Sequence, residues 1–125
     1  MNRILIVDQH VEMRLAIRMT LRSFGHTAEI VEAADADTAL ALARALVPEL
    51  VLTDVHLHGT MDGVGLCRAL KAEPATRLID IVIISAKAAP QDRAAGLHAG
   101  ACAYLAKPFL PMELDHALDD IGVRP

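Results

Sequence analysis

Aromatic side chains are nearly absent from this sequence. Its 125 residues include one Tyr, two Phe and no Trp, although hydrophobic residues make up 54% of the chain. The core must therefore be built from Val, Ile, Leu, Ala and Met, which suits a parallel β-sheet covered by helices on both faces. The lack of stacking aromatics also argues against flavin binding, which in addition needs a Ser/Thr-rich phosphate loop after the first strand.

Cysteine, excess positive charge and long apolar runs are scarce as well. Cys67 and Cys102 show no motif spacing, so we expect two buried thiols in a reducing compartment. The net charge of −4, with His neutral, offers no general attraction for nucleic acid. No apolar stretch approaches the roughly 20 residues of a membrane helix, and no signal peptide precedes the first predicted strand. We expect a cytoplasmic, globular protein that contacts neither nucleic acid nor a membrane directly.

Five short aliphatic runs alternate with five segments of helical periodicity, which indicates an α/β fold. The predicted strands are residues 3–7, 28–33, 50–53, 80–85 and 102–105. The predicted helices run from Met13 to Phe24, from the cap Asp35 to Leu46, from Val64 to Ala72, from Ala89 to near Gly100, and from Pro111 to Ile121. Without repeats or a linker, residues 1–125 are expected to form one domain, with helices on both faces of a parallel sheet.

Some of these elements have features beyond their apolar faces. Glutamates interrupt the strand 28–33, so we expect it toward an edge of the sheet. The helix that ends near Gly100 is rich in alanine and has a thin apolar pattern, so we expect it to be the least firmly packed. Arg14, Arg18 and Arg22 form a basic stripe along the first helix. We favour a solvated face over a docking surface for an acidic partner.

Polar side chains follow four of the five predicted strands. Asp8 and Gln9 follow the first, Asp54 the third, Ser85 the fourth and Lys107 the fifth. Because the carboxyl ends of parallel strands meet at one edge of a sheet, we expect these side chains to share a pocket. Two carboxylates suit Mg²⁺, and a lysine adds a point charge for anionic oxygens. Any one residue alone could be a helix cap or a solvated side chain, but their joint occurrence favours phosphoryl transfer with Asp54 as nucleophile.

The segments around these residues resemble the receiver domain of two-component response regulators, in the single-domain form of chemotaxis regulators. The matching segments are Ile4–Asp8, Leu50–Asp54, Met61–Gly63, Ile83–Ala86 and Tyr104–Phe109, in the right order and spacing over the whole chain. The resemblance implies a flavodoxin-like, doubly wound fold with five parallel strands in the order 2-1-3-4-5 and five helices.

The resemblance also implies roles for the strand-end residues. Asp54 would accept a phosphoryl group from a histidine kinase or a histidine phosphotransfer protein. Asp8, Asp54 and the backbone carbonyl of His56 would hold Mg²⁺, and Lys107 and Ser85 would contact the phosphoryl oxygens. Such a protein is a phosphoacceptor rather than an enzyme, with at most self-phosphorylation from small donors and slow self-dephosphorylation.

Three side chains near the pocket are expected to tune or transmit phosphorylation. Tyr104 matches the family's switch aromatic, which moves inward with the hydroxyl residue, although an ordinary strand residue with its hydroxyl in water is the alternative. The side chains of His56 and Lys87 flank the path of an attacking water, so they are expected to slow hydrolysis of the acyl phosphate. Phosphorylation would then control the docking of a downstream protein partner.

Two departures from the family pattern bear on function. Relatives have a second acidic residue where Gln9 stands, and an amide attracts a divalent cation less strongly than a carboxylate, so we expect weak Mg²⁺ binding. The loop after Asp54 has His58 in place of the usual Pro and one extra residue. Gln9 keeps open a pseudo-receiver, a protein-interaction module that does not use phosphorylation. A phosphatase with an aspartate nucleophile is disfavoured, because His56 stands where the second Asp of such enzymes belongs.

The last strand and helix give an expectation about assembly. Many DNA-binding relatives pair through the fourth helix, fifth strand and fifth helix, with acidic residues before the strand aromatic and basic residues on the last helix. Here Ala101, Cys102 and Ala103 precede Tyr104, and the last helix is acidic. We therefore expect a monomer or a dimer of another kind, with no output domain on this chain.

Overall fold

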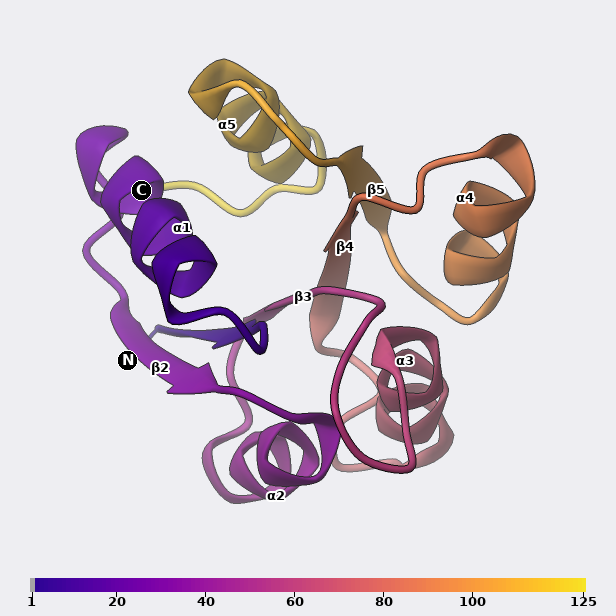
Figure 1. Cartoon of the computed structure of the whole chain (residues 1–125). Helices are drawn as coiled ribbons and strands as arrows, with labels where there is room; N and C mark the ends of the chain where they lie inside the picture. Colours follow the sequence, from indigo (N-terminus) through magenta and orange to yellow (C-terminus); the bar gives the residue numbers. More distant parts are fainter. Residues whose placement is uncertain (1) are drawn as a thin grey trace.

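The computed structural model describes residues 2–125, which form a five-stranded sheet between two layers of helices (Figure 1). The strands are β1 (Arg3–Val7), β2 (Glu29–Ala33), β3 (Leu50–Thr53), β4 (Asp80–Ser85) and β5 (Ala103–Ala106). All neighbouring strands are parallel, in the order β2-β1-β3-β4-β5. The predicted flavodoxin-like fold is confirmed, and so is the edge position of the second strand.

Helices cover both faces of this sheet. They are α1 (Val11–Ser23), α2 (Ala36–Leu46), α3 (Gly63–Ala72), α4 (Pro90–His98) and α5 (Pro111–Asp120). Figure 1 shows α1 and α5 on one side of the sheet and α2, α3 and α4 on the other. Three predicted strands, residues 3–7, 50–53 and 80–85, have the bounds of β1, β3 and β4. The other predicted boundaries differ from the structure by at most two residues, because hydrophobic periodicity does not fix the last turn of a helix or the first pair of a strand.

Alternation along the strands supplies both apolar cores. In β1, Leu5 and Val7 point toward α2 and α3, whereas Ile4 and Ile6 point toward α1 and α5. The other central strands behave in the same way, and their side chains are buried on both faces. A sheet buried on both faces needs near-continuous aliphatic strands, which explains why so few aromatic residues suffice.

The register of the sheet brings the strand ends together. Val7 of β1 pairs with Thr53 of β3, so the next residues, Asp8 and Asp54, leave adjacent strands at the same level. Adjacent strands lie about 4.8 Å apart. The order of the strands reverses between β1 and β3, and in open α/β sheets such a point is where ligands bind.

The prediction of two buried thiols is right for Cys67 and wrong for Cys102. Cys67 is buried in α3, and burial raises the pKa of its thiol to about 11. Cys102 is exposed, because it precedes the edge strand β5 and its side chain lies outside the core, 3.5 Å from Asp80 Oδ1. Its backbone N–H still donates to the carbonyl of Ile81, so the chain around it resembles a strand even though the thiol is not covered.

Helix α4 is packed by a glycine rather than by large side chains. Gly96 is the buried residue of this helix, and a Cβ atom at this position would lie 2.8 Å from Ile83 Cδ1 and from Tyr104 Cδ2. The helix can therefore lie close to β4 and β5 only because this position has no side chain. This agrees with the thin apolar pattern predicted for the helix.

Within residues 2–125, no helix combines the length and the apolar character that crossing a membrane requires.

Helix α2 ends in a strained conformation. The helix stops at Leu46, two residues before Pro48, and Val47 follows with a φ of 45°. This left-handed conformation costs an L-residue roughly 1–2 kcal/mol and is costlier for β-branched side chains. The Val47 side chain is half exposed, so little apolar burial offsets the strain.

We predict that Val47→Gly raises the free energy of unfolding by about 0.5–1 kcal/mol, since glycine adopts this conformation freely but loses more entropy on folding. Urea unfolding followed by circular dichroism measures the change. Val47→Ala keeps the Cβ atom and should gain less. A Val47→Gly protein that is less stable than the parent would contradict the assignment of strain.

Candidate functional site

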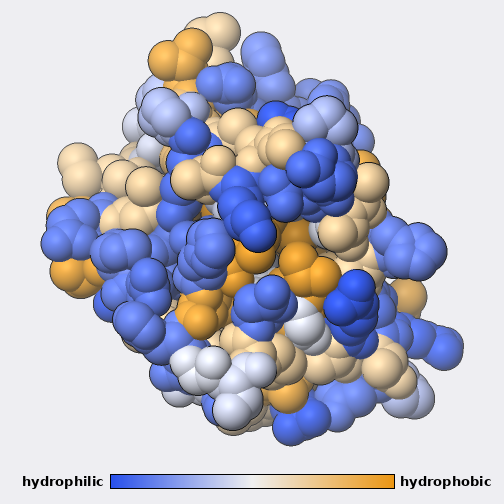
Figure 2. All heavy atoms as spheres, turned by 45° about the vertical axis from the view of Figure 1, so that its right-hand side comes forward, coloured by the Kyte–Doolittle hydropathy of each residue, from blue (hydrophilic) through white to orange (hydrophobic). Residues whose placement is uncertain are grey.

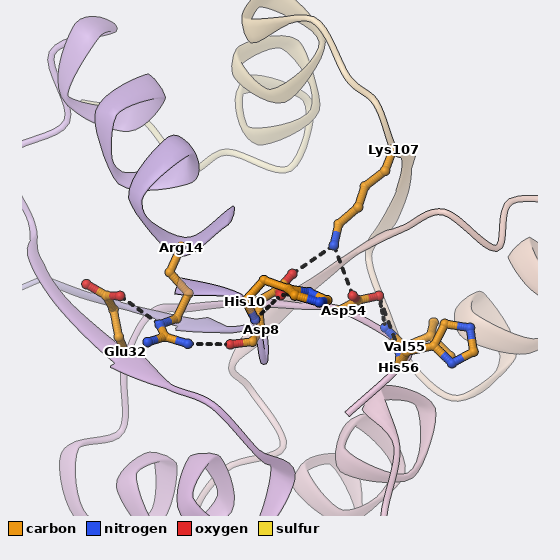
Figure 3. A network of polar contacts seen from close by, with 8 residues as sticks. All are labelled: Asp8, His10, Arg14, Glu32, Asp54, Val55, His56 and Lys107. Atoms are coloured by element: carbon orange, nitrogen blue, oxygen red, sulfur yellow. Dashed lines mark hydrogen bonds and ion pairs between the residues drawn. The ribbon is translucent and has the colours of Figure 1, made fainter. Parts of the chain in front are cut away.

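Lys107 lies between two buried carboxylates at the carboxyl edge of the sheet. Its Nζ donates to Asp8 Oδ2 at 2.8 Å and to Asp54 Oδ2 at 2.9 Å (Figure 3). Asp8 and Asp54 are 1% and 6% exposed, and the Lys107 side chain is 13% exposed. These three residues directly follow β1, β3 and β5, so the structure brings together groups that lie up to 99 positions apart in the sequence.

The charges of the two carboxylates hold Lys107 in its protonated form. Burial lowers the pKa of Lys107, but the hydrogen bonds and charges of Asp8 and Asp54 outweigh it, so the pKa lies above its ordinary value. The three side chains together have a formal charge of −1. The site therefore retains negative charge even with its own cation in place.

The backbone orients the Asp54 carboxylate. The N–H groups of Val55 and His56 donate to Asp54 Oδ1, at 2.6 and 3.3 Å. Asp54 Oδ2 has no backbone donor among the residues described and faces Lys107 instead. The two oxygens thus have different environments, one fixed by the turn and one facing the ammonium.

The start of α3 closes against the Asp54 backbone, which explains the segment Asp62–Gly63. Asp62 caps the helix by accepting the Gly65 N–H at 2.8 Å. A Cβ on Gly63 would lie 1.8 Å from the Asp54 carbonyl oxygen, and the Gly63 N–H donates to the Val55 carbonyl at 2.8 Å. Only glycine permits this approach, so the residue is required by the geometry of the site.

The turn after β1 surrounds Asp8 with donors. The His10 backbone N–H donates to Asp8 Oδ1 at 2.8 Å, and His10 Nδ1 lies 3.3 Å from the same oxygen. The carboxylate is buried, whereas the His10 side chain is 62% exposed. Gln9 lies between Asp8 and His10 and is partly exposed. The position that carries a second acidic residue in the family pattern therefore belongs to the same turn.

The prediction of a solvated basic stripe on α1 is wrong for Arg14. Its side chain is 16% exposed; Nε donates to Glu32 Oε1 at 2.8 Å and Nη1 to the backbone carbonyl of Asp8 at 2.6 Å (Figure 3). Arg18 also pairs with Glu32, at 2.7 Å, and Arg22 donates to the carbonyl of His26. The reason is that Glu32 of β2 lies on the face of the sheet that α1 covers, so its carboxylate attracts Arg14 and Arg18 toward the sheet.

Ser85, Lys87 and Tyr104 form a second chain of contacts beside the carboxylates. Ser85 is fully buried, and its Oγ accepts the Lys87 N–H at 3.1 Å. The Tyr104 hydroxyl donates to the Lys87 carbonyl, and burial raises the pKa of the phenol above its ordinary value. In this conformation the Tyr104 hydroxyl is therefore engaged with the β4–α4 segment and is not simply in water.

A cavity of about 220 Å³ adjoins this segment. It is lined by Val55, Asp62, Val64, Lys87, Asp92, Ala95 and Tyr104. Figure 2 shows a hollow in the middle of its face, where apolar atoms are visible between hydrophilic residues. A larger cavity, about 410 Å³, lies at the opposite edge of the sheet beside Asn2, His26 and Arg124, and it contains none of the predicted site residues.

The loop after Asp54 is fixed at its middle. His58 forms an isolated parallel bridge with Asp35 at the start of α2, and the partly buried Leu57 packs against the core under that helix. His56 is exposed, and its imidazole points away from the carboxylates in Figure 3. The structure thus brings the His56 backbone to the site, while the imidazoles of His56 and His58 stay outside the Asp8–Asp54–Lys107 group.

The donor set fits a magnesium ion of the type expected from the resemblance. Within residues 2–125, no three or more His, Cys, Asp or Glu side chains are arranged to hold a metal ion. Mg²⁺ commonly uses only one or two protein carboxylates and keeps several waters. Asp8 and Asp54 provide two, and the Lys107 ammonium already lies as a cation between them.

Comparison with known proteins agrees with this geometry. The family model for the response regulator receiver domain matches residues 4–119. A gliding motility regulatory protein from Myxococcus xanthus is 38% identical over 118 residues, which are 94% of this chain and 15% of that protein. The chain spans between 15% and 48% of the length of the curated relatives it matches.

Solved structures show the same fold over nearly the whole chain. The chemotaxis response regulator CheY4 of Vibrio cholerae has a TM-score of 0.85 and 27% identity, covering 97% of this chain and 98% of that one. The receiver domain of a sensor histidine kinase from Pseudomonas aeruginosa PAO1, solved with a magnesium ion coordinated in its active-site cleft, has a TM-score of 0.83 and 31% identity, with 95% of each chain covered. This chain belongs to the response regulator receiver domain family.

Proposed function

We propose that this domain works as a phosphoacceptor in a two-component or phosphorelay system, with Asp54 as the residue that is phosphorylated. The observation that supports it is the Lys107 ammonium held between the buried carboxylates of Asp8 and Asp54. Buried charges are costly unless they are paired, and clusters of buried charges are concentrated at functional sites. The proposed donor is a histidine kinase or a histidine phosphotransfer protein.

We propose a role in the transfer for each group, based on the contacts it makes. Asp54 Oδ2 is the proposed nucleophile, because it faces the Lys107 ammonium that would pair with the phosphoryl oxygens, whereas Oδ1 accepts from two backbone N–H groups. Its bond to phosphorus forms as the bond between phosphorus and the donor's imidazole nitrogen breaks. Lys107 stays protonated and pairs with the phosphoryl oxygens. Mg²⁺, held by Asp8, Asp54 and the His56 carbonyl, would supply the remaining neutralising charge.

Ser85 and Tyr104 provide a route from the phosphoryl group to the surface. Both hold the same residue, since Lys87 donates its N–H to Ser85 Oγ and accepts the Tyr104 hydroxyl at its carbonyl. A phosphoryl group that draws Ser85 toward Asp54 would break the first of these bonds and favour another arrangement of Tyr104. Phosphorylation would thereby shift the population between two forms with different affinities for a downstream protein.

The second candidate is a pseudo-receiver that binds partners without phosphorylation. The observation in its favour is Gln9, an uncharged residue in the turn that holds Asp8. In either case the domain acts by accepting a group or binding a protein, and not by turning over a substrate of its own.

The deciding experiment is intact mass after incubation with acetyl phosphate, with and without Mg²⁺. We predict a gain of one phosphoryl group that requires Mg²⁺ and is absent in Asp54→Ala. A chain that gains no phosphoryl group at any Mg²⁺ concentration, while remaining folded by circular dichroism, would establish the pseudo-receiver instead.

Restoring the missing acidic residue tests the role of the Gln9 position. Gln9→Asp should tighten Mg²⁺ binding by about tenfold, since a carboxylate attracts a divalent cation more strongly than an amide and about 1.4 kcal/mol of added attraction is a factor of ten. Isothermal titration calorimetry measures the affinity, and Gln9→Glu serves as a longer carboxylate control. Equal Mg²⁺ affinities for the parent and Gln9→Asp would show that this side chain does not face the metal.

Two exposed side chains are proposed to slow loss of the phosphoryl group. Lys87 Nζ lies 4.0 Å from Asp92 Oδ1, and its side chain is 56% exposed at the rim of the 220 Å³ cavity. We predict that His56→Ala and Lys87→Ala each shorten the half-life of the phosphorylated protein by about fivefold, the change that about 1 kcal/mol in the barrier produces. Half-lives from mass spectra over time decide this. Unchanged values in both variants would remove these side chains from the mechanism.

A further inference from the structure

Arg14 connects the edge strand β2 to the turn that follows β1. Its guanidinium uses two different edges, with Nε donating to Glu32 Oε1 at 2.8 Å and Nη1 to the Asp8 carbonyl at 2.6 Å. Figure 3 shows Arg14 extending between Glu32 on one side and Asp8 on the other. The side chain is mostly buried, so both bonds are shielded from water.

The sheet itself fixes the position of Glu32, the carboxylate partner of Arg14. Glu32 pairs in register with Ile6 of β1, two residues before Asp8. A planar guanidinium with donors in fixed directions cannot satisfy both partners unless their separation is fixed. The bond to Asp8 therefore fixes the peptide that immediately follows the carboxylate's own Cα, and through it the direction in which that carboxylate leaves the strand.

Asp8 also makes contacts with the other polar groups of the site. The Asp8 carboxylate accepts from Lys107 Nζ through Oδ2 and from the His10 N–H through Oδ1. Arg14 acts on the third acceptor of Asp8, its main-chain carbonyl. Because Gln9 has no charge, Asp8 is the one acidic side chain of this turn, and its direction matters more than in a turn with two.

We propose that Arg14, clamped by Glu32, is a positioning residue for the phosphoacceptor pocket, which sets the direction of the Asp8 carboxylate for the divalent cation. This rests on the proposed function, in which Asp8 is a metal-holding residue. Groups that orient the ligands of a metal typically change its affinity by 10–100-fold when they are removed. The effect should therefore appear in metal binding and not only in stability.

Arg14→Met tests the proposal, since methionine keeps the apolar stem and removes both donors. Mg²⁺ affinity of the unphosphorylated chain, measured by calorimetry, should fall by about tenfold. In phosphorylation by acetyl phosphate, the half-saturating Mg²⁺ concentration should rise by a similar factor, with a smaller change in the rate at saturating Mg²⁺. Arg14→Lys can reach one partner but not both, so its Mg²⁺ affinity should lie between those of the parent and Arg14→Met.

Arg18 is the matched control. It pairs with Glu32 Oε2 at 2.7 Å on the same helix, but it makes no contact with Asp8 among the residues described. Arg18→Met removes the same charge and the same kind of ion pair, so its Mg²⁺ affinity should stay within twofold of the parent. Glu32→Gln, which loosens the anchor and leaves Arg14 in place, should weaken binding by less than Arg14→Met.

The outcomes separate this proposal from the proposed function. Each variant is also made in the Gln9→Asp chain, where tighter Mg²⁺ binding is expected. The comparison of Arg14→Met with Arg18→Met can then be repeated in that background. Equal losses of Mg²⁺ affinity in Arg14→Met and Arg18→Met would overturn the positioning role and indicate a general effect of charge. So would an unchanged affinity in Arg14→Met, or in Glu32→Gln if Arg14→Met does not fold. A parent chain that binds Mg²⁺ but is never phosphorylated would refute phosphotransfer and leave the Arg14 comparison valid.

Discussion

The contact between Lys107 and two buried carboxylates is the constraint on which the site depends. Two like charges on adjacent strands repel each other at low dielectric, and neither can be left unpaired without a large desolvation cost. Lys107 satisfies one oxygen of each, and backbone N–H groups satisfy the others. Removing Lys107 would leave two buried carboxylates that repel each other with no cation between them. The arrangement is stable only as a set, yet its net negative charge keeps it receptive to a further cation.

The rest of the fold supplies the rigidity that this set requires. Strands β1 and β3 are aliphatic on both faces and covered by helices, so a slip of one residue would move every side chain of a strand into the opposite core. Asp8 and Asp54 continue that register directly, which makes their separation a property of the sheet and not of flexible loops. By contrast, the α4 side of the site packs through Gly96 and the ring of Tyr104. Few side chains therefore hold α4 on the sheet, and segments with few buried apolar contacts open more readily than the core strands.

Hydrophobic periodicity predicted a parallel α/β sheet, and the resemblance to receiver domains supplied its strand order. The strand ends pointed to Asp8, Asp54 and Lys107, which the structure brings into contact. Asp8, Asp54, Ser85 and Lys107 could be found because each directly follows or ends a strand, and topology does the rest. Arg14 could not be found in this way, since the surface of a helix gives no sign of which strand residue faces it. Cys102 was misjudged for a related reason: strand-like surroundings do not say which side of an edge strand is covered. Contacts that depend on the relative placement of two elements need coordinates.

In the proposed phosphotransfer, the neutral Gln9 would affect the cation and the phosphoryl group in opposite ways. At about 4 Å and an effective dielectric constant of about 20, one pair of unit charges interacts by about 4 kcal/mol. Loss of one carboxylate therefore removes attraction for a divalent cation and, in similar measure, removes repulsion of a phosphoryl group with about two negative charges. The two effects largely offset each other when cation and phosphoryl group are bound together, whereas cation binding alone is only weakened. Under that proposal, a turn with Gln9 would penalise the unphosphorylated metal complex more than the phosphorylated one, and metal binding and phosphorylation would be more strongly coupled than in a turn with two acids.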